Sequence, residues 1–269
     1  MSVITISRGS YSKGKEVAEK VAKRLGYDCI SRDVVLEASK EFNTPEIKLV
    51  RALHDAPSIL SQFAGGRKKY IAFIRAALLR HFSEDNVVYH GLAGHFFVKG
   101  IPHVLKVRIV AEMEDRVRCE MAREGISERE ARRILKKDDE ERRKWSRTLY
   151  GIDPRDPDLY DMVIHIRKTT VDDAVDIICH TVGLKDYQTT PASQTAIEDL
   201  ALAAEVKAIC WESGHNIAVS SQCGMVYVKT EAPLAQEHAL CSDLERISKN
   251  IPGVKDFKVN VLPVAPYSE

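Results

Sequence analysis

Over the first 182 residues, short apolar runs of strand length alternate with longer stretches whose apolar residues recur at helical spacing. The strand-length runs cover residues 3–7, 87–90, 105–111 and 162–166, and the helical stretches cover residues 15–25, 67–83, 114–123, 127–147 and 170–182. Strands that alternate with helices form a parallel sheet with helices on both faces. The pattern therefore predicts an α/β domain over residues 1–182.

A polar stretch without apolar periodicity, residues 183–195, follows this domain and contains Pro191. Its composition predicts a linker. The chain then reads as helix, strand, strand, helix and strand over residues 196–210, 216–221, 225–230, 233–250 and 254–262. Cys223 and Gly224 predict a hairpin turn between the first two strands. Residues 196–269 are thus predicted to form a small α+β domain of α-β-β-α-β order.

Composition narrows the class of protein. The chain has 269 residues, and 40 Lys and Arg against 39 Asp and Glu give a formal net charge of +1, which argues against a nucleic-acid binder. No apolar run reaches the roughly 18–20 residues that span a bilayer, and the first residues lack the pattern of a secretory signal. The six cysteines are scattered without a CxxC pair, as in reduced cytosolic proteins. These features predict a soluble, cytoplasmic protein.

The segment from Gly9 to Lys15 fits the pattern GxxxxGK between a predicted strand and a predicted helix. Such a loop turns its amide N–H groups toward a phosphate, and the helix N-terminus adds positive potential. Lys15 is expected to reach the outer phosphates, and the remaining candidates for this site are Arg8, Ser12, Lys13, Gly14 and Glu16. Glu16 stands where Ser or Thr usually holds magnesium, so its carboxylate either repels phosphate or helps to hold the metal. The alternative is an ordinary strand-turn-helix with a chance pair of glycines.

Residues 115–147 carry twelve Lys and Arg and nine Asp and Glu. One interpretation is a solvated helical surface with pairs of opposite charge one turn apart. The other is a mobile lid, because phosphoryl transfer needs positive charge around the transferred group. Under that second interpretation the candidate lid residues are Arg116, Arg123, Arg132 and Arg142.

These motifs together resemble the cytidylate kinase-like family of P-loop kinases. The carrying residues are Ile4–Arg8 with the loop that follows, the turn EGISEREA at residues 124–131, Asp139 with Arg142, the string LYGIDPRDPDLYDMVI at residues 149–164, and VDDAVDII at residues 171–178. The resemblance covers residues 1–182. It implies a P-loop kinase fold and transfer of the γ-phosphoryl of ATP, with Mg²⁺, to CMP or dCMP. Lys15 and the loop amides would hold the β- and γ-phosphates, and the four arginines would form the lid.

The resemblance also suggests an acceptor site. Asp33 falls where the family has an acidic residue after its second strand, which implies binding of the acceptor or the metal. Gly91 matches the family's acceptor-contacting Gly-Arg pair, but Leu92 replaces the arginine, and leucine makes no bidentate contact with a phosphate or a base. Two alternatives therefore stand beside the nucleotide kinase: a non-catalytic nucleotide-binding sensor that signals to a partner, and a kinase for another small molecule.

The C-terminal segment resembles a BON domain, a small module linked in its family to membrane or ligand association. The carrying residues are Val206, Gly224 and the segment from Ile251 to Lys255. The resemblance implies a binding or regulatory role. Residues 196–269 show no acid-base or nucleophilic constellation that would indicate catalysis.

Overall fold

The computed structural model describes residues 1–31, 33–46, 48–49, 64–91, 93–212, 217–233, 236–248 and 250–263. Five parallel strands form the larger sheet in the order β2-β3-β1-β4-β5. Their bounds are β1 (Val3–Arg8), β2 (Asp28–Ile30), β3 (Val87–His90), β4 (Val104–Ala111) and β5 (Met162–Ile166). The predicted parallel α/β architecture is confirmed, with β1 at the centre of the sheet.

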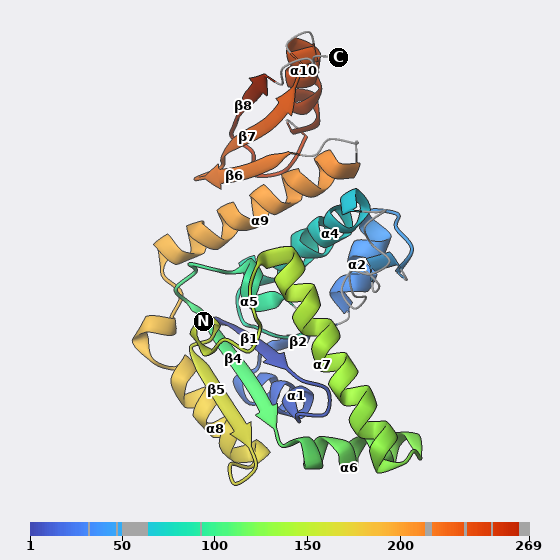
Figure 1. The fold of residues 1–269 in the computed structure, drawn as a ribbon. Helices are drawn as coiled ribbons and strands as arrows, with labels where there is room; N and C mark the ends of the chain where they lie inside the picture. Colours follow the sequence, from blue (N-terminus) through green and yellow to red (C-terminus); the bar gives the residue numbers. More distant parts are fainter. Residues whose placement is uncertain are drawn as a thin grey trace.

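Helices cover both faces of this sheet (Figure 1). The central strand shows why, because its side chains alternate between two cores: Val3 belongs to one apolar cluster, and Ile4 and Ile6 belong to the other. On the Ile4 side lie α1 (Gly14–Leu25) and α8 (Val171–Val182). On the Val3 side lie α2 (Asp33–Glu41), α4 (Ala64–Ser83) and α5 (Gly94–Phe97).

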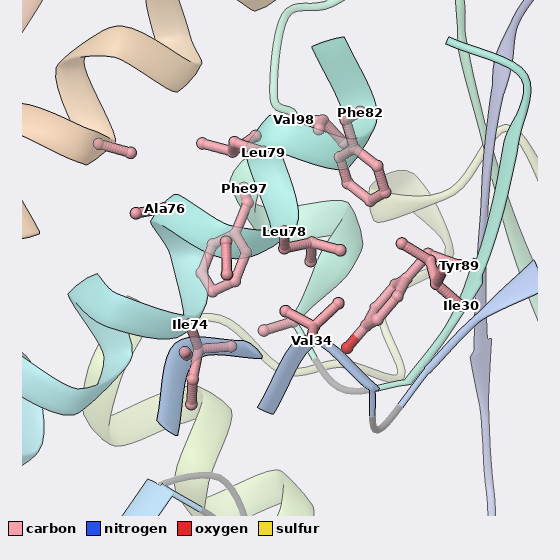
Figure 2. Packing of buried hydrophobic residues seen from close by; sticks show 14 of the residues in the cluster. Ile30, Val34, Ile74, Ala76, Leu78, Leu79, Phe82, Tyr89, Phe97 and Val98 are labelled. Carbon is pink, nitrogen blue, oxygen red and sulfur yellow. The ribbon is translucent and has the colours of Figure 1, made fainter. Parts of the chain in front are cut away.

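Aromatic packing fixes α4 on the sheet. Figure 2 shows Leu78, Leu79 and Phe82 of α4 among the buried side chains near Tyr89 of β3. The rings of Phe82 and Tyr89 meet edge to face, with their centroids 5.9 Å apart. Because α4 is anchored in this way, it can carry other elements on its outer side.

A helical hairpin stands at the carboxyl edge of the sheet. It consists of α6 (Met113–Glu124) and α7 (Glu128–Tyr150), and Gly125 ends α6 in a left-handed conformation. Ser127 caps α7 by accepting a hydrogen bond from the amide of Glu130, as the Ser-x-x-Glu pattern favours. The indole of Trp145 near the end of α7 is fully buried in the core that contains α4. The first half of α7 is thereby left free of that core.

The stretch predicted as a linker is largely helical. A short 3-10 helix covers Lys185–Tyr187, and α9 (Pro191–Glu212) already begins at Pro191. Thr190 and Ser193 cap α9 reciprocally, since the hydroxyl of each accepts a hydrogen bond from the amide of the other, at 3.1 and 3.0 Å. The linker prediction is therefore corrected for residues 191–195. Their polar side chains mark a helix start, with proline at the first position.

The second sheet has three strands in the order β6-β7-β8, with β6 (Ala218–Gln222) antiparallel and β8 (Asp256–Pro263) parallel to β7 (Met225–Ala232). With α9 and α10 (Glu237–Ser248), these strands complete the predicted α-β-β-α-β order. The predicted hairpin turn is confirmed, because Cys223 and Gly224 both have positive φ angles, 51° and 82°. The carboxylate of Asp199 on α9 accepts hydrogen bonds from the amides of both turn residues.

Helix α9 contributes side chains to two hydrophobic cores. Ile197, Ala204 and Ala208 belong to the cluster that contains α4, whereas Val206 and Cys210 belong to the core of the second sheet. Figure 1 shows α9 lying between α4 and the three-stranded sheet.

Within the described ranges, no helix combines the length and the apolar character that crossing a bilayer requires.

Candidate active site

The loop between β1 and α1 folds back on itself. Tyr11 and Lys13 take left-handed conformations, with φ angles of 56° and 67°. The amide and the hydroxyl of Ser12 both donate to the carbonyl oxygen of Gly9, at 3.4 and 3.0 Å. The structure thus supplies the strand-loop-helix context that the GxxxxGK pattern requires.

The two glycines of the pattern have different surroundings. A Cβ atom on Gly14 would lie 2.6 Å from Cβ and 2.9 Å from Cδ of Arg8, so the first turn of α1 packs directly on the end of β1. At Gly9 the nearest atom to an added Cβ would be 3.6 Å away, on the guanidinium of Arg116. Of these two glycines, Gly14 alone lacks room for a side chain.

Gly14→Ala is expected to destabilise the folded state by about 1–3 kcal/mol, because Arg8 Cβ belongs to the strand and has little freedom to move. Gly9→Ala is the matched control and is expected to unfold at the wild-type denaturant concentration. Urea unfolding of the two variants measures the difference, and equal midpoints would contradict the close packing of α1 on Arg8.

Two arginines of the helical hairpin bind the loop. Arg116 of α6 donates from Nε to the carbonyl of Ser10 at 2.8 Å, and its two Nη atoms pair with the carboxylate of Asp139 on α7 at 2.8 and 2.9 Å. Arg142 of α7 donates to the carbonyl of Arg8 at 3.1 Å and to Ser10 Oγ at 3.0 Å. Both helices of the hairpin are thus tied to the loop.

The positive charge at the loop is concentrated and only partly compensated. Burial lowers the pKa of Arg8, and the guanidinium of Arg142 lowers it further. Burial likewise lowers the pKa of Arg142. Arg8 Nε is buried and has no hydrogen-bond acceptor. Charged donors in this state favour an anion, since desolvated cations gain most from a charge-assisted hydrogen bond.

The other two predicted lid arginines are placed differently. Arg123 lies 4.9 Å from the centre of the Tyr11 ring and pairs with Glu124 at 2.6 Å, so it borders the loop without contacting its backbone. Arg132 pairs with Glu114 at 3.2 Å and Glu128 at 3.0 Å. The structure thus brings Arg116, Arg123 and Arg142 to the loop and holds Arg132 in ion pairs on the hairpin surface.

The lysines of the loop extend outward. The side chain of Lys15 is 64% exposed, and its Nζ lies 3.6 Å from the carboxylate of Glu19. The Glu16 carboxylate lies 3.7 Å from Lys13 and 3.5 Å from Lys20. Because two ammonium groups flank Glu16, its negative charge is offset toward an approaching phosphate.

Two cavities adjoin the loop. The first, the loop cavity, has a volume of about 620 Å³ and is lined by residues of the loop and α1 and by Glu120, Arg123, Asp138 and Arg142. The second, the inner cavity, has a volume of about 240 Å³. Seven cationic side chains line the inner cavity, compared with two carboxylates, those of Asp139 and Glu140. The cationic side chains are those of Arg8, Arg108, Arg116, Lys136, Arg142, Arg143 and Arg155. The excess of cations in the inner cavity suits an anionic ligand.

A hydrogen-bonded group forms one wall of the inner cavity. The hydroxyl of Tyr160 donates to the carbonyl of Pro154 at 2.8 Å and lies 3.3 Å from both Ser7 Oγ and His95 Nε2. Arg108 donates to the same hydroxyl at 3.2 Å and also to the carbonyl of Pro154. Burial, with a smaller contribution from Arg108, lowers the pKa of His95 to about 3, so the imidazole is neutral at pH 7.

This histidine gives a pH prediction. The pKa of His95 is lower in the folded chain than the ordinary 6.5. As the pH falls from 6.5 toward 3, His95 therefore binds a proton in the unfolded chain but not in the folded chain, and the folded state loses stability. Between pH 7 and pH 5 the wild type is therefore expected to lose about 2 kcal/mol more stability than His95→Gln. Urea unfolding at both pH values measures this, with the exposed His180→Gln as control. An equal loss in all three proteins would contradict a buried neutral His95.

Comparisons with known proteins identify the family to which most of the α/β domain belongs. Residues 3–168 match the Cytidylate kinase-like family. The chain belongs to the cytidylate kinase-like family. A cytidylate kinase from Methanopyrus kandleri is 31% identical over 103 residues, 35% of this chain and 53% of that enzyme. The chain thus spans about half the length of this curated relative.

One of two similar solved structures supports the fold. An uncharacterized protein from Eubacterium ventriosum aligns with 68% of this chain and 98% of its own, at 22% identity and a TM-score of 0.51. A shikimate kinase from Bacteroides thetaiotaomicron aligns with 68% of this chain and 99% of its own, at 12% identity and a TM-score of 0.43. The Eubacterium structure supports the fold of the α/β domain.

The acceptor residues expected from the cytidylate kinase-like family lie at the carboxyl edge of the sheet. Asp33 is the exposed first residue of α2, close enough to His90 to influence its pKa. Gly91 follows β3, and a Cβ there would lie 2.4 Å from the Tyr89 hydroxyl. Neither residue lines the loop cavity or the inner cavity. Leu92, which departs from the family's Gly-Arg pair, lies outside the described residues.

The side chains that the structure describes at the loop are suited to binding the phosphates of ATP, but they do not form a cluster of metal ligands. The unpaired buried Nε of Arg8 and the cluster of arginines suit a triphosphate. In the ranges that the structure describes, no three His, Cys, Asp or Glu side chains gather as metal ligands. Mg²⁺ needs only one or two carboxylates when phosphate oxygens complete its shell, and the carboxylates of Glu16 and Asp138 are among those that line the loop cavity.

Proposed function

We propose that the chain is a phosphotransferase that moves the γ-phosphoryl group of ATP, with Mg²⁺, to a nucleoside monophosphate. The observation that carries this proposal is the contact of Arg116 and Arg142 with the backbone of the Gly9–Lys15 loop. A loop that holds phosphates beneath two lid arginines provides the positive charge that phosphoryl transfer requires.

Each residue then has a role. Lys15 and the loop amides hold the β- and γ-phosphates, and Arg8 supplies its free Nε–H to a phosphate oxygen. Arg116 and Arg142 stabilise the charge on the transferring group. An acceptor oxygen forms a bond to the γ-phosphorus while the bond from that phosphorus to the β,γ-bridging oxygen breaks and ADP leaves. Mg²⁺, when bound, neutralises charge on the phosphate oxygens.

The acceptor is proposed to be CMP or dCMP, bound in the inner cavity. Support comes from the family and from the cations of that cavity, because Arg108, Arg143 and Arg155 can face the acceptor phosphate across from the loop. His95, being neutral, offers a polar edge without adding charge. Asp33 and Gly91 would contact the acceptor only if it extends beyond this cavity toward β2 and β3.

A non-catalytic sensor is the second candidate. Helix α9 favours it, because this helix joins the core of the α/β domain to that of the second sheet and provides a rigid connection between them. In this alternative the loop binds nucleotide, and the C-terminal module, proposed to be BON-like, associates with a membrane surface or a ligand. A kinase for another small acceptor is the third candidate, motivated by Leu92.

The deciding experiment measures ADP production from ATP and Mg²⁺ with each of the four common nucleoside monophosphates. Turnover that depends on CMP or dCMP supports the proposed kinase. A rise in melting temperature with ATP but no turnover favours the sensor or a different small acceptor. If ATP has no effect on melting or turnover, both the kinase and the sensor are excluded.

A further inference from the structure

A tight turn follows α7 and lies against the inner cavity. The amide of Asp156 donates to the carbonyl of Asp153 at 3.0 Å, which closes a turn of four residues. We call residues 153–156 the wall turn. Pro154 and Arg155 of this turn line the inner cavity, whereas Asp153 does not. Any effect of the Asp153 carboxylate on the cavity therefore passes through the residues that it binds.

The Asp153 carboxylate binds two of the arginines that line the inner cavity. Arg143 of α7 donates to it from Nε at 3.0 Å. Arg155 donates to it from Nε at 3.3 Å, from Nη2 at 3.1 Å and from the backbone amide at 3.0 Å. Each guanidinium has five N–H groups, of which Asp153 engages one on Arg143 and two on Arg155. The carboxylate thus holds both arginines while it uses a minority of their donors.

These contacts also keep Asp153 ionised. Arg147, one turn after Arg143 on α7, donates to the same carboxylate at 2.9 Å. The hydrogen bonds from Arg155 first, and then the one from Arg143, hold the pKa of Asp153 well below its ordinary value, although burial acts in the opposite direction. A charged acceptor with charged donors makes stronger and better-directed hydrogen bonds than a neutral pair does.

The backbone of the wall turn holds a third cation of the inner cavity. The carbonyl of Pro154 accepts hydrogen bonds from Arg108 of β4 and, at 2.8 Å, from the hydroxyl of Tyr160. The guanidinium of Arg108 also lies 5.5 Å from the centre of the Tyr160 ring. The Asp153 side chain and the Pro154 carbonyl thus arrange arginines from β4, from α7 and from the turn itself around one cavity.

The exposure of the side chains shows what Asp153 contributes. The Arg155 side chain is 60% exposed, and an arginine with that much access to solvent populates many rotamers unless something binds it. The Asp153 side chain is only 23% exposed, so a partly buried group fixes an exposed one. Arg132 gives the contrast, because both of its carboxylate partners are exposed and it lines neither the loop cavity nor the inner cavity.

We propose that Asp153 is a positioning residue for the acceptor, and that its carboxylate holds Arg143 and Arg155 where both guanidiniums donate to the acceptor phosphate in the inner cavity. This inference rests on the proposed function, which places the acceptor there. Guanidinium groups bind phosphate through paired N–H donors, so their orientation matters as well as their charge. Because Asp153 orders the two arginines beforehand, the binding energy of the acceptor is not consumed in ordering them.

The test compares CMP with ATP in the full-length Asp153→Asn variant, by calorimetry and by steady-state kinetics. CMP should bind roughly 10–100-fold more weakly and its KM should rise by a similar factor, because small misplacements of binding groups are costly. The kcat at saturating CMP should fall by a smaller factor. Arg116 and Arg142 hold the Gly9–Lys15 loop, so the affinity for ATP should stay within about twofold of the wild type.

Three further variants separate positioning from a general structural role. Asp158→Asn changes an exposed aspartate just after the wall turn and should match the wild type in melting temperature and in both KM values. In the double variant Arg143→Gln, Arg155→Gln, adding Asp153→Asn should change CMP binding by less than about twofold, because neither arginine is left to position. Arg155→Gln alone alters one exposed side chain and should weaken CMP but not ATP, which tests the proposal even if Asp153→Asn fails to fold.

The proposal is overturned if Asp153→Asn binds CMP as tightly as the wild type, if CMP and ATP weaken by the same factor, or if Asp153→Asn keeps its full effect in the double variant. A wild-type chain that does not bind CMP overturns it as well. A wild-type chain that binds CMP but produces no ADP excludes the proposed kinase alone, and calorimetry of the variants then decides the role of Asp153.

Discussion

Replacing Lys15 with alanine is expected to slow ATP-dependent phosphoryl transfer by roughly 10²–10³-fold, the usual cost of removing one charged donor from a transferring group. The fold should be unaffected. The side chain is 64% exposed, and its one ion pair, with Glu19, is long at 3.6 Å. The unfolding free energy is therefore expected to stay within about 0.5 kcal/mol of the wild type. ADP production and urea unfolding measure the two quantities.

Lys23→Ala provides the matched control, because Lys23 is an exposed lysine in the last turn of the same helix. It should retain full turnover. If Lys15→Ala turns over as fast as this control, Lys15 has no part in the reaction. A large loss of stability in Lys15→Ala would instead show that the side chain supports the loop.

The second large effect is expected at Arg142. Arg142→Ala should lower kcat by roughly 10²-fold and weaken ATP binding by a smaller factor, because a lid arginine acts mainly on charge that develops during transfer. The same change removes the hydrogen bonds to the carbonyl of Arg8 and to Ser10 Oγ. Arg142→Lys keeps the charge but not the fork of donors, and should fall between the wild type and the alanine variant.

Arg118→Ala serves as the control for the hairpin, since the Arg118 side chain on α6 is 76% exposed and, among the described residues, pairs with Asp115 alone. It should leave kcat and ATP affinity unchanged. Steady-state kinetics and ATP titration separate the two effects. An Arg142→Ala variant that loses ATP affinity but keeps kcat would assign Arg142 to binding of the ground state.

The sequence predicted the sheet well because its strands are apolar runs. β3 and β5 begin and end where the pattern places them, and β1 and β4 differ from it by one residue at one end. The three-residue β2 was missed, since Asp28 and Cys29 are exposed and form no run. The four-residue α5 is likewise too short for a period to appear.

The site was predicted in part, for a geometric reason. The pattern GxxxxGK lies within one segment, so the loop was visible in the sequence. Which arginine reaches the loop depends on how α6 and α7 cross it: Arg132 and Arg142 are ten residues apart on α7, about 15 Å along the helix. Arg108 and Tyr160 come from separate strands and loops, and nothing in the sequence indicated that they meet at the inner cavity.

The dual role of α9 sets how the chain unfolds. Ile197, Ala204 and Ala208 complete the core around α4, so the stability of the α/β domain depends on residues beyond the segment that matches the cytidylate kinase-like family. Because α9 joins the two cores, we expect heat or urea to melt both sheets in a single transition. The family match ends at residue 168, whereas the hydrophobic core that contains α4 also includes residues of α9. A fragment that ends at residue 182 would therefore expose the apolar face of α4 that packs against α9.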